Sequence, residues 1–291
     1  MGSLENKGLE LAATARIFVP EQQGGLSWTS TLTVARNRNK VTELYDHQPI
    51  GSSSRVEEGK PLRFYRGYVM EGIFQSYDEI AAHATQVTNS NPRRATAPGD
   101  IAFKDLNGDG VINADDQTMI GSPWPDYEGG WTNDLSYGSF DLSAFVQFSQ
   151  GNDIRNGFRG YADQFGSYGD NNTTRALKRW TPTNTDTNEP RAVWGDPNQN
   201  TRLSSRFIED GSYVRLKNIV LGYNLPSDLV GSVGLRSARV YVQGQNVFTH
   251  TNFGGFDPEV NSGGSSESTL GWDFYAMPQL RTFSFGVNVG L

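Results

Sequence analysis

The chain repeatedly alternates hydrophobic and polar residues, which is the pattern of β-strands that present two different faces. Four segments show the alternation most clearly: 9–19, 26–34, 140–150 and 282–291. In the second segment, one face carries four hydrophobic residues with a serine between them: Leu26, Trp28, Ser30, Leu32 and Val34. Its other face consists of Ser and Thr. The chain is therefore expected to fold mainly as antiparallel β-structure.

Four further strands are expected, which makes eight in all: 62–74, 127–137, 212–225 and 237–249. In the third of these the hydrophobic phase changes, because Val214 and Leu216 are in one register and Ile219 is in the other. One extra residue in a strand restores the facing. We therefore predict a β-bulge near Lys217–Asn218. The alternative is that Val214 and Leu216 lie on the polar face.

Two architectures place such strands differently. In a soluble sandwich the apolar faces pack on a shared core, whereas in an outer-membrane barrel they face lipid and the polar faces line a wet lumen. The polar faces here are almost uninterrupted Thr, Ser, Asn and Gln, and several strands exceed the usual five to six residues. These two features favour a segment of an antiparallel transmembrane β-barrel.

The connections between the expected strands are unequal. Gly138–Ser139 is a tight turn, whereas a long loop covers 151–204 and contains several aromatic residues, among which we single out Trp180, Trp194, Tyr161 and Tyr168. Such side chains can stack on sugar rings or pack on a partner protein. Ser76 to Glu79 form a capping-box pattern before a short helix, and a second short helix is expected over 172–180. Alternating short turns and long loops are typical of outer-membrane barrels.

Composition narrows the function classes. The net charge of −7, from 25 Lys+Arg and 32 Asp+Glu, gives no reason to expect a nucleic-acid partner. There are no cysteines, which excludes thiol nucleophiles and thiolate metal sites. With 33 glycines and a mean hydropathy of −0.55, the chain has no apolar run long enough for a transmembrane helix. The first residues also lack the basic and apolar stretches of a signal peptide.

One motif has specific chemistry. The segment 105–116 follows the twelve-residue pattern of a calcium-binding loop, with oxygen donors at positions 1, 3 and 5, glycine at 6 and a carboxylate at 12. The expected ligands are Asp105, Asn107, Asp109 and Asp116 by side chain, Val111 by its carbonyl, and Asn113 through water. An ordinary cluster of Asn-Gly and Asp-Gly turns is the alternative. Because the preceding residues 100–104 are not an amphipathic helix, a structural Ca²⁺ that fixes a long loop is expected.

No arrangement of residues in the sequence indicates catalysis. The three histidines are scattered without metal-ligand spacing, and the Gly-x-Ser-x-Gly motif of serine hydrolases is missing. Carboxylates are numerous, but no pair with glycosidase character is indicated. The chain is therefore not expected to be an enzyme.

Several short stretches occur in a characteristic order along the whole chain. They include Asn6–Glu10, Gly67–Gln75, the acidic loop, Ile120–Pro123, Arg179–Pro182, Phe207–Asn218, Leu221–Pro226, Gln245–Thr249, Asp257–Val260 and Pro278–Thr282. In this combination the chain resembles the C-terminal part of a SusC/RagA-family TonB-dependent outer-membrane transporter. The combination of Ser-Tyr-x-Arg-Leu-Lys-Asn at 212–218 with Asp-Pro-Glu at 257–259 is the most specific part of this resemblance.

The resemblance implies that residues 1–291 supply about eight C-terminal strands of a 22-stranded barrel in the bacterial outer membrane. It implies import of oligosaccharides or peptides with a SusD-type surface lipoprotein, driven by TonB. TonB would act through an N-terminal region, and the plug domain and first strands would lie upstream of anything in this sequence. Met1 would then mark a late start or a truncated gene. This chain is not expected to transport alone.

The last strand matches a barrel-assembly signal of alternating residues, here Ser284, Gly286, Val289 and Leu291. The usual terminal aromatic residue is replaced by Leu291. One alternative from another class stays open at this point. A soluble, calcium-stabilised β-sandwich that binds carbohydrate through exposed tryptophans would also combine alternating strands with an acidic loop.

Overall fold

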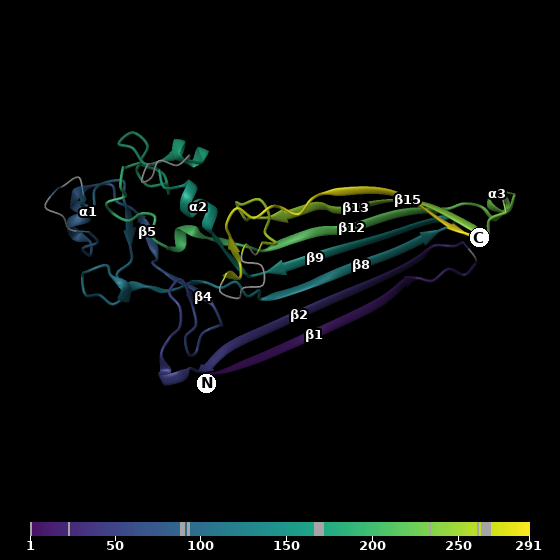
Figure 1. Cartoon of the computed structure of the whole chain (residues 1–291), viewed down its shortest axis with the longest axis horizontal. Helices are drawn as coiled ribbons and strands as arrows, with labels where there is room; N and C mark the ends of the chain where they lie inside the picture. The colour runs from purple at the N-terminus through teal and green to yellow at the C-terminus, as the bar shows by residue number, and fades with distance from the viewer. Residues whose placement is uncertain are drawn as a thin grey trace.

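The computed structural model describes residues 2–22, 24–87, 91, 94–165, 172–232, 234–260, 262 and 269–291. Its main element is one seven-stranded sheet with the order β1-β2-β8-β9-β12-β13-β15. The strands are β1 (Ser3–Phe18), β2 (Ser27–Glu43), β8 (Tyr127–Tyr137), β9 (Phe140–Gln150), β12 (Tyr213–Asn224), β13 (Ser237–Thr251) and β15 (Thr282–Gly290). Each neighbouring pair is antiparallel, so the chain runs up and down across the sheet in sequence order (Figure 1).

Seven of the eight expected strands lie in this sheet, and the segment 62–74 does not. It forms two short strands, β4 (Phe64–Gly67) and β5 (Met70–Ile73), which belong to two separate small sheets. Phe64 and Tyr65 are adjacent in sequence and both only 2% exposed. Since neighbouring residues of a strand point to opposite faces, both faces of β4 are covered by protein. A strand of the main sheet would leave one face open.

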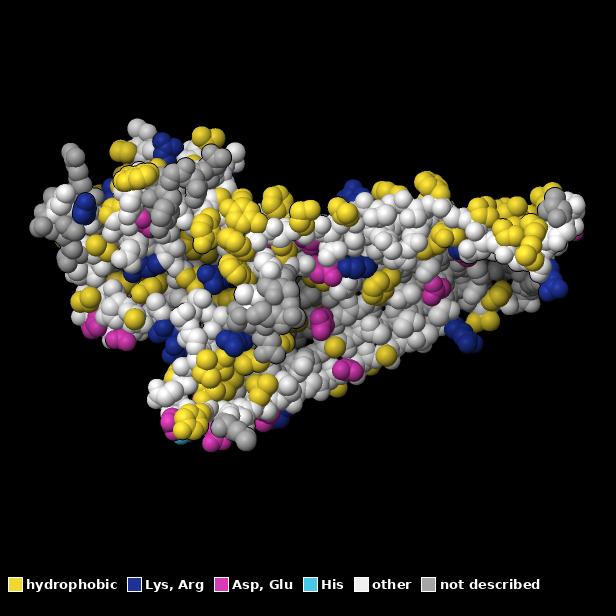
Figure 2. Space-filling model, in the orientation of Figure 1, with side chains coloured by type: hydrophobic (Ala, Val, Ile, Leu, Met, Phe, Trp, Pro, Cys, Tyr) yellow, Lys and Arg dark blue, Asp and Glu magenta, His cyan; other side chains and the backbone are white. Residues whose placement is uncertain are grey.

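The cross-strand register places hydrophobic side chains in rows on one face of the sheet. One such row runs through Ala13, Leu32, Trp131, Val146 and Leu216, which are partners in successive strand pairs. The outer residues of this face are exposed, with Phe285 at 85% and Val287 at 63%. In Figure 2, hydrophobic side chains line the border of the sheet along β13 and β15. A sandwich would cover this face with a second sheet, so the sandwich alternative is excluded and the sheet is a barrel segment.

The expected bulge in β12 is confirmed. The register of β12 shifts between Leu216 and Asn218 against both neighbours, β9 and β13. Val214 pairs with Phe148, and after the shift Leu221 pairs with Leu142. Phe148 and Leu142 are both on the hydrophobic face of β9, so the extra residue keeps both halves of β12 on that face. The alternative placement of Val214 and Leu216 on the polar face is wrong.

Two polar residues interrupt the hydrophobic face at one level of the sheet. Ser30 of β2 and Asn133 of β8 are direct cross-strand partners. The indole Nε1 of Trp131 donates to Ser30 Oγ at 2.8 Å, and the indole Nε1 of Trp28 donates to Asn133 Oδ1 at 3.0 Å. Each polar side chain is therefore hydrogen-bonded within the sheet, which lowers the cost of placing it on a face without water.

The two ends of the sheet differ strongly (Figure 1). At one end, residues 138–139 form the expected tight turn, and α3 (Ser227–Gly231) lies between β12 and β13. At the other end, the connections 44–126, 151–212 and 252–281 fold together, and we call the described residues of these three connections the loop cap. It contains β4 and β5, β3 (Ser54–Arg55), β6 (Ile101–Phe103), β7 (Thr118–Gly121), β10 (Asp153–Asn156), β11 (Ile208–Asp210) and β14 (Trp272–Asp273).

Helices are short and lie mostly in the loop cap. They are α1 (Tyr77–Ala82), α2 (Gly157–Ala162) and the 3-10 turns η1 (Tyr45–His47), η3 (Ala114–Asp116), η4 (Thr174–Lys178) and η5 (Ser205–Phe207). The expected cap of α1 is confirmed, because Ser76 Oγ accepts from the Glu79 N–H. The helix expected over 172–180 is the 3-10 turn η4. Within the described residues, no helix has the length and apolar character to cross a membrane.

Most of the buried hydrophobic residues lie in the loop cap, and Val41 of β2 and Tyr213 of β12 are buried within the main sheet. Ile101 and Phe103 of β6 are fully buried and pack with Ile112. This position of the core follows from the sheet itself, whose hydrophobic face carries exposed side chains such as Phe285 and Val287. The loop cap is thus a folded unit at one end of the sheet, and it holds the polar clusters and the pocket described next.

Candidate functional site

The three connections of the loop cap are joined by short sheets. β10 forms an antiparallel pair with β11 and a parallel pair with β14. The pair with β14 links connection 151–212 to connection 252–281. Tyr68 forms a bridge with Ser204, which links 44–126 to 151–212. Because backbone hydrogen bonds join all three, side chains placed on these strands have fixed positions relative to one another.

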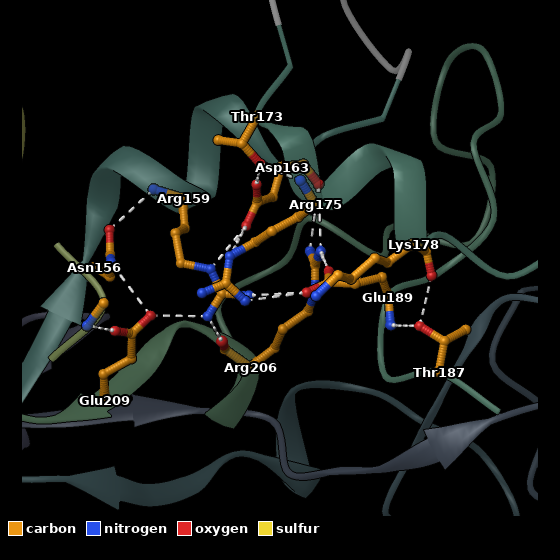
Figure 3. Close-up of polar contacts among 11 residues, drawn as sticks. Asn156, Arg159, Asp163, Thr173, Arg175, Lys178, Thr187, Glu189, Arg206 and Glu209 are labelled. Carbon is orange, nitrogen blue, oxygen red and sulfur yellow. Dashed lines mark hydrogen bonds and ion pairs between the residues drawn. The ribbon is translucent and has the colours of Figure 1, made fainter. Parts of the chain in front are cut away.

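An ion-pair network occupies the interior of connection 151–212 (Figure 3). Arg159 of α2 donates to Asp163 Oδ2 at 2.7 Å and to Glu209 Oε1 at 2.8 Å. Arg206 of η5 donates to Glu189 Oε2 at 2.7 Å. Arg175 of η4 adds a contact of 3.3 Å to the other oxygen of Glu189, which completes a set of three guanidinium groups and three carboxylates.

Burial decides how strongly this network holds the fold. The side chains of Asp163 and Arg206 are 0% and 3% exposed. Burial alone would lower the pKa of Arg159, but its hydrogen bonds to Asp163 and Glu209 outweigh burial and raise that pKa. For Arg206, burial prevails over Glu189 and lowers the pKa. Loss of one partner leaves an uncompensated buried charge, which typically costs about 3–5 kcal/mol.

A second polar cluster joins the first two connections. Asp100 is fully buried and accepts two hydrogen bonds from Arg191, at 2.8 and 2.9 Å. Asn200 also donates to Asp100 Oδ1 at 3.0 Å, and Asn198 donates to the Ile101 carbonyl. Such bidentate guanidinium–carboxylate pairs fix both distance and orientation. The cluster therefore holds residue 100 of the first connection against residues 191–200 of the second.

The four aromatic residues expected to meet a substrate or partner have different positions. Trp180 is a contact between connections, because its Nε1 donates to Gln75 Oε1 at 2.8 Å and its ring lies over Gly99. Trp194 is 76% exposed. Tyr161 is 51% exposed and lines a pocket of about 480 Å³ together with Trp272. Tyr168 lies outside the described residues. Trp180 and Trp194 do not line this pocket, so the structure does not gather the four in one site.

The segment 105–116 folds into a compact turn that its own side chains support. Asp105 accepts from the N–H groups of Gly108 and Gly110, at 2.7 and 2.9 Å. Asp116 is fully buried and accepts from the N–H groups of Leu106 and Asn113. Gly110 has a φ of 78°, as the sharp turn at position 6 of a calcium loop requires.

The remaining donors of this segment are arranged in the same way. Asn107 Oδ1 accepts from the Asp109 N–H, Asp109 Oδ1 accepts from the Val111 N–H, and the Asn113 amide contacts the Val111 carbonyl. Within the described parts of the chain, no group of three or more His, Cys, Asp or Glu residues is assembled as a metal site. The donor set therefore matches the loop pattern in sequence and turn geometry, while its oxygens accept from backbone N–H groups.

The residues of the assembly signal lie along β15. Ser284 and Gly286 are on the polar face, opposite Gln243 and Tyr241 of β13, and Val289 is on the hydrophobic face. The Tyr241 ring covers Gly286, where a Cβ atom would lie 2.3 Å from the ring. Leu291 follows the end of the strand and is 86% exposed. The glycine of this pattern thus has a structural reason in the tyrosine beside it.

Sequence reasoning missed both the ion-pair network and the pocket beside Tyr161. Arg159, Glu189 and Glu209 come from three separated segments without periodicity, and only the fold brings them together. One signal was available: Glu209 belongs to the stretch Phe207–Asn218 that supported the family resemblance. That stretch points to Glu209 as a residue of interest, but nothing in the sequence indicates which arginine pairs with it.

Comparison with known proteins finds relatives that are all TonB-dependent receptors. No protein-family model matches the chain. TonB-dependent receptor P3 of Formosa agariphila is 35% identical over 305 residues, which cover 99% of this chain and 29% of the receptor. SusC of Bacteroides thetaiotaomicron, also a TonB-dependent receptor, is 26% identical over 99% of this chain and 26% of its own length. The chain belongs to the SusC/RagA group of TonB-dependent receptors. The resemblance seen in the sequence is thereby confirmed.

Solved structures support the fold of this SusC/RagA-type chain. The RagAB peptide transporter superposes with a TM-score of 0.76 at 23% identity, covering 99% of this chain and 29% of that one. The RagAB peptide importer in its open-open state gives a TM-score of 0.74 at 20% identity, covering 100% and 29%. The SusC/RagA-type chain is thus an outer-membrane protein built as an antiparallel barrel segment, and it spans less than a third of the length of the relatives it matches.

Proposed function

We propose that this chain forms part of a TonB-dependent importer that takes up oligosaccharides or peptides together with a SusD-type surface lipoprotein. The observation that carries the proposal is the match along 99% of the chain to TonB-dependent receptors, including SusC. The relatives are receptors and transport proteins rather than enzymes. A structural neighbour is a peptide transporter, which supports peptides beside oligosaccharides as cargo. Import would require the complete receptor, including the region that contacts TonB, rather than this chain alone.

The loop cap offers a surface for the lipoprotein partner. Leu177 and Trp194 belong to connection 151–212, and they are 80% and 76% exposed. Exposed large hydrophobic side chains of this kind are typical of protein–protein contact sites. The loop cap lies at the opposite end of the sheet from the short turns, which in outer-membrane barrels lie on the periplasmic side. This arrangement supports contact with a partner on the cell surface.

The proposal is tested with the complete receptor in its own cells. Uptake of a fluorescent oligosaccharide and of a fluorescent peptide is measured with TonB present and deleted. We expect uptake of one cargo to require both the receptor and TonB. Unchanged uptake of both cargoes after deletion of the receptor gene contradicts the proposal.

Partner binding is measured separately, by co-purification of the SusD-type lipoprotein with tagged receptor. The double variant Leu177→Ala with Trp194→Ala is expected to reduce recovery of the lipoprotein at least severalfold, since it removes two large exposed hydrophobic side chains of the connection 151–212. Leu229→Ala is the matched control, because Leu229 is 62% exposed on α3 at the turn end of the sheet (Figure 1). Equal recovery from both variants contradicts the proposed surface.

We also propose a structural Ca²⁺ in the loop 105–116. The side chains of Asp105, Asn107, Asp109 and Asp116 with the Val111 carbonyl would hold the ion, and Asn113 would act through water. In support, the turn geometry is already set by hydrogen bonds of these side chains to the backbone. The ion would fix the loop that leads from β6 to β7.

A further inference from the structure

Arg155 is a cation at the centre of the small sheet in the loop cap. It belongs to β10, the middle strand of the order β11-β10-β14, and pairs with Ile208 on one side and Trp272 on the other. Its guanidinium lies over the Trp272 ring at 5.4 Å from the centroid and donates to Ser53 Oγ at 3.1 Å. The side chain is therefore held in place by neighbours from two other connections.

Arg155 differs from the other interior arginines in the nature of its partners. Arg159 and Arg206 each pair with a carboxylate within 3 Å. The groups that face Arg155 are instead the hydroxyls of Tyr65, Tyr161 and Ser53 and the ring of Trp272, and no Asp or Glu among the described residues forms an ion pair with it. Burial lowers the pKa of Arg155, because it removes part of the guanidinium from water.

Arg155 lines the pocket of about 480 Å³. This volume is in the usual range for small-ligand sites. Tyr161 of α2 and Phe207 of η5 give it aromatic walls. Asn156 at the same wall is already engaged, because its amide donates to Glu209 and its oxygen accepts from the Arg159 N–H. Among the described residues that line the pocket, Arg155 is thus the cationic side chain that remains for a ligand.

The aromatic wall depends on one close approach. Gly157 follows directly after β10, and a Cβ atom there would lie 2.1 Å from Trp272 Nε1. Only glycine lets the indole lie against the start of α2. The ring of Phe274 stacks on Trp272 at 5.1 Å and contacts Tyr161 at 5.3 Å, which holds these two aromatic rings of the pocket in place.

We propose that this pocket binds the carboxylate group of an imported molecule, with Arg155 as the anion partner and Tyr161 and Trp272 as walls for the adjoining ring or side chain. A planar guanidinium matches a carboxylate in a two-point contact, and aromatic walls suit the flat face of a sugar ring or an apolar side chain. A uronic acid and the carboxyl terminus of a peptide share this chemistry. The assignment rests on the proposed import function for the origin of its ligand.

The test measures ligand binding to the complete receptor in detergent by isothermal titration. The probes are a glucuronic acid disaccharide with its neutral glucose counterpart, and a tripeptide as free acid and as C-terminal amide. We expect one acidic probe to bind more tightly than its neutral partner, and Arg155→Gln to raise the Kd of that acid about tenfold or more. The sugar and peptide pairs identify the source of the carboxylate.

Two further variants separate binding from folding. Arg155→Lys keeps the charge but not the planar fork, and we expect a smaller rise in Kd than for Arg155→Gln. Lys178→Gln removes one exposed cation from the same connection and is expected to leave the Kd unchanged. The proposal is overturned if Arg155→Gln leaves the Kd of both acids unchanged, or if it weakens the acid and its neutral partner equally. Because titration needs no TonB, failed binding with intact uptake contradicts the pocket assignment alone.

Discussion

Arg215 of β12 donates from its two terminal nitrogens to Asp257 at 2.5 Å and to Glu259 at 2.9 Å. Lys217 donates to both oxygens of Glu259, at 2.9 and 2.7 Å. The ion pairs join the stretch 212–218 to the stretch 257–259, which together gave the most specific part of the family resemblance. The two motifs are therefore one structural unit, in which a strand of the barrel holds the connection 252–281.

This unit predicts a large effect of Arg215→Met. The Arg215 and Asp257 side chains are 2% and 5% exposed, so the substitution leaves a buried carboxylate without its cation. We expect a loss of about 3–5 kcal/mol of stability and faster amide exchange in 252–260, measured by hydrogen exchange on the receptor in detergent. Arg239→Met breaks the more exposed pair with Asp141 and is the control. Unchanged exchange in 252–260 would contradict the role of Arg215.

Deletion of Lys217 is expected to impair assembly of the barrel. The deletion removes the extra residue of the bulge, so a one-residue slip sends either Val214 or Leu221 to the polar face. We expect much less folded receptor in the outer membrane, measured as the fraction that shifts mobility on heating. Lys217→Ala keeps the strand length and should assemble. Equal folded fractions for the deletion and for Lys217→Ala would show that the bulge is dispensable.

The indole pairs on the hydrophobic face predict a coupled effect. Trp131→Phe removes the indole N–H that donates to Ser30. The Ser30 hydroxyl is then left without this partner on a lipid-facing surface. We expect the free energy of unfolding to fall by about 1 kcal/mol beyond the effect of the packing change. In the double variant, Ser30→Ala should recover part of this loss. Unfolding free energies in lipid vesicles give the coupling through a double-mutant cycle. Additive effects would argue against the hydrogen bond.

Asp153 predicts a pH-dependent stability of the loop cap. Burial raises the pKa of its carboxyl and outweighs the opposing hydrogen bond from the Ser122 N–H, while Asp210 and Asp126 add smaller contributions that also raise this pKa. The folded state therefore holds the proton more firmly than the unfolded state. The contribution of Asp153 to folding stability is fully present below the ordinary Asp pKa. It is lost as pH rises through the raised pKa of the folded state.

The isosteric Asp153→Asn keeps an oxygen for the Ser122 N–H and removes the titration. We expect this variant to lose less stability than the parent protein as pH rises from 4 to 7. Thermal unfolding at each pH measures this stability. A matched substitution, Asp228→Asn on α3, lies at the other end of the sheet and should leave the profile unchanged. Parallel profiles for parent and Asp153→Asn would contradict the shift.

The calcium proposal predicts ion-dependent protection of residues 100–120. With Ca²⁺ present, the receptor should resist protease in this segment, and a chelator should restore cleavage. Asp105→Ala or Asp109→Ala should abolish the difference, because each removes a side-chain ligand and a support of the turn. Asp115→Ala, outside the expected ligand set, is the control. Equal cleavage of the parent with Ca²⁺ and with chelator would rule out the ion.

The main sheet could be predicted from the sequence because the residues that determine each strand lie next to one another along the chain. Alternation of residues fixes which side chain faces lipid, and a phase change in that alternation locates the bulge at Lys217. The short helix α1 was found for the same reason, since Ser76 and Glu79 form its cap within one turn. The interior of the loop cap depends on contacts between distant segments.

Segment 62–74 shows the limit of such reasoning. Its apolar residues suggested another strand of the sheet, but Phe64 and Tyr65 are both buried by other parts of the loop cap. Trp180 likewise looked available for a substrate, yet it contacts Gln75, more than a hundred residues away in sequence. No local pattern distinguishes an aromatic residue that packs between loops from one that meets a ligand.

The ties between the connections have a consequence for engineering and for evolution. Asp100 with Arg191, and Tyr68 with Ser204, join the first connection to the second, while β10 with β14 joins the second to the third. A loop transplanted singly from a relative would lose these cross-links and leave charges without partners. Cargo range should therefore be exchangeable between such receptors only when all three connections are grafted together, as one cassette on an unchanged sheet.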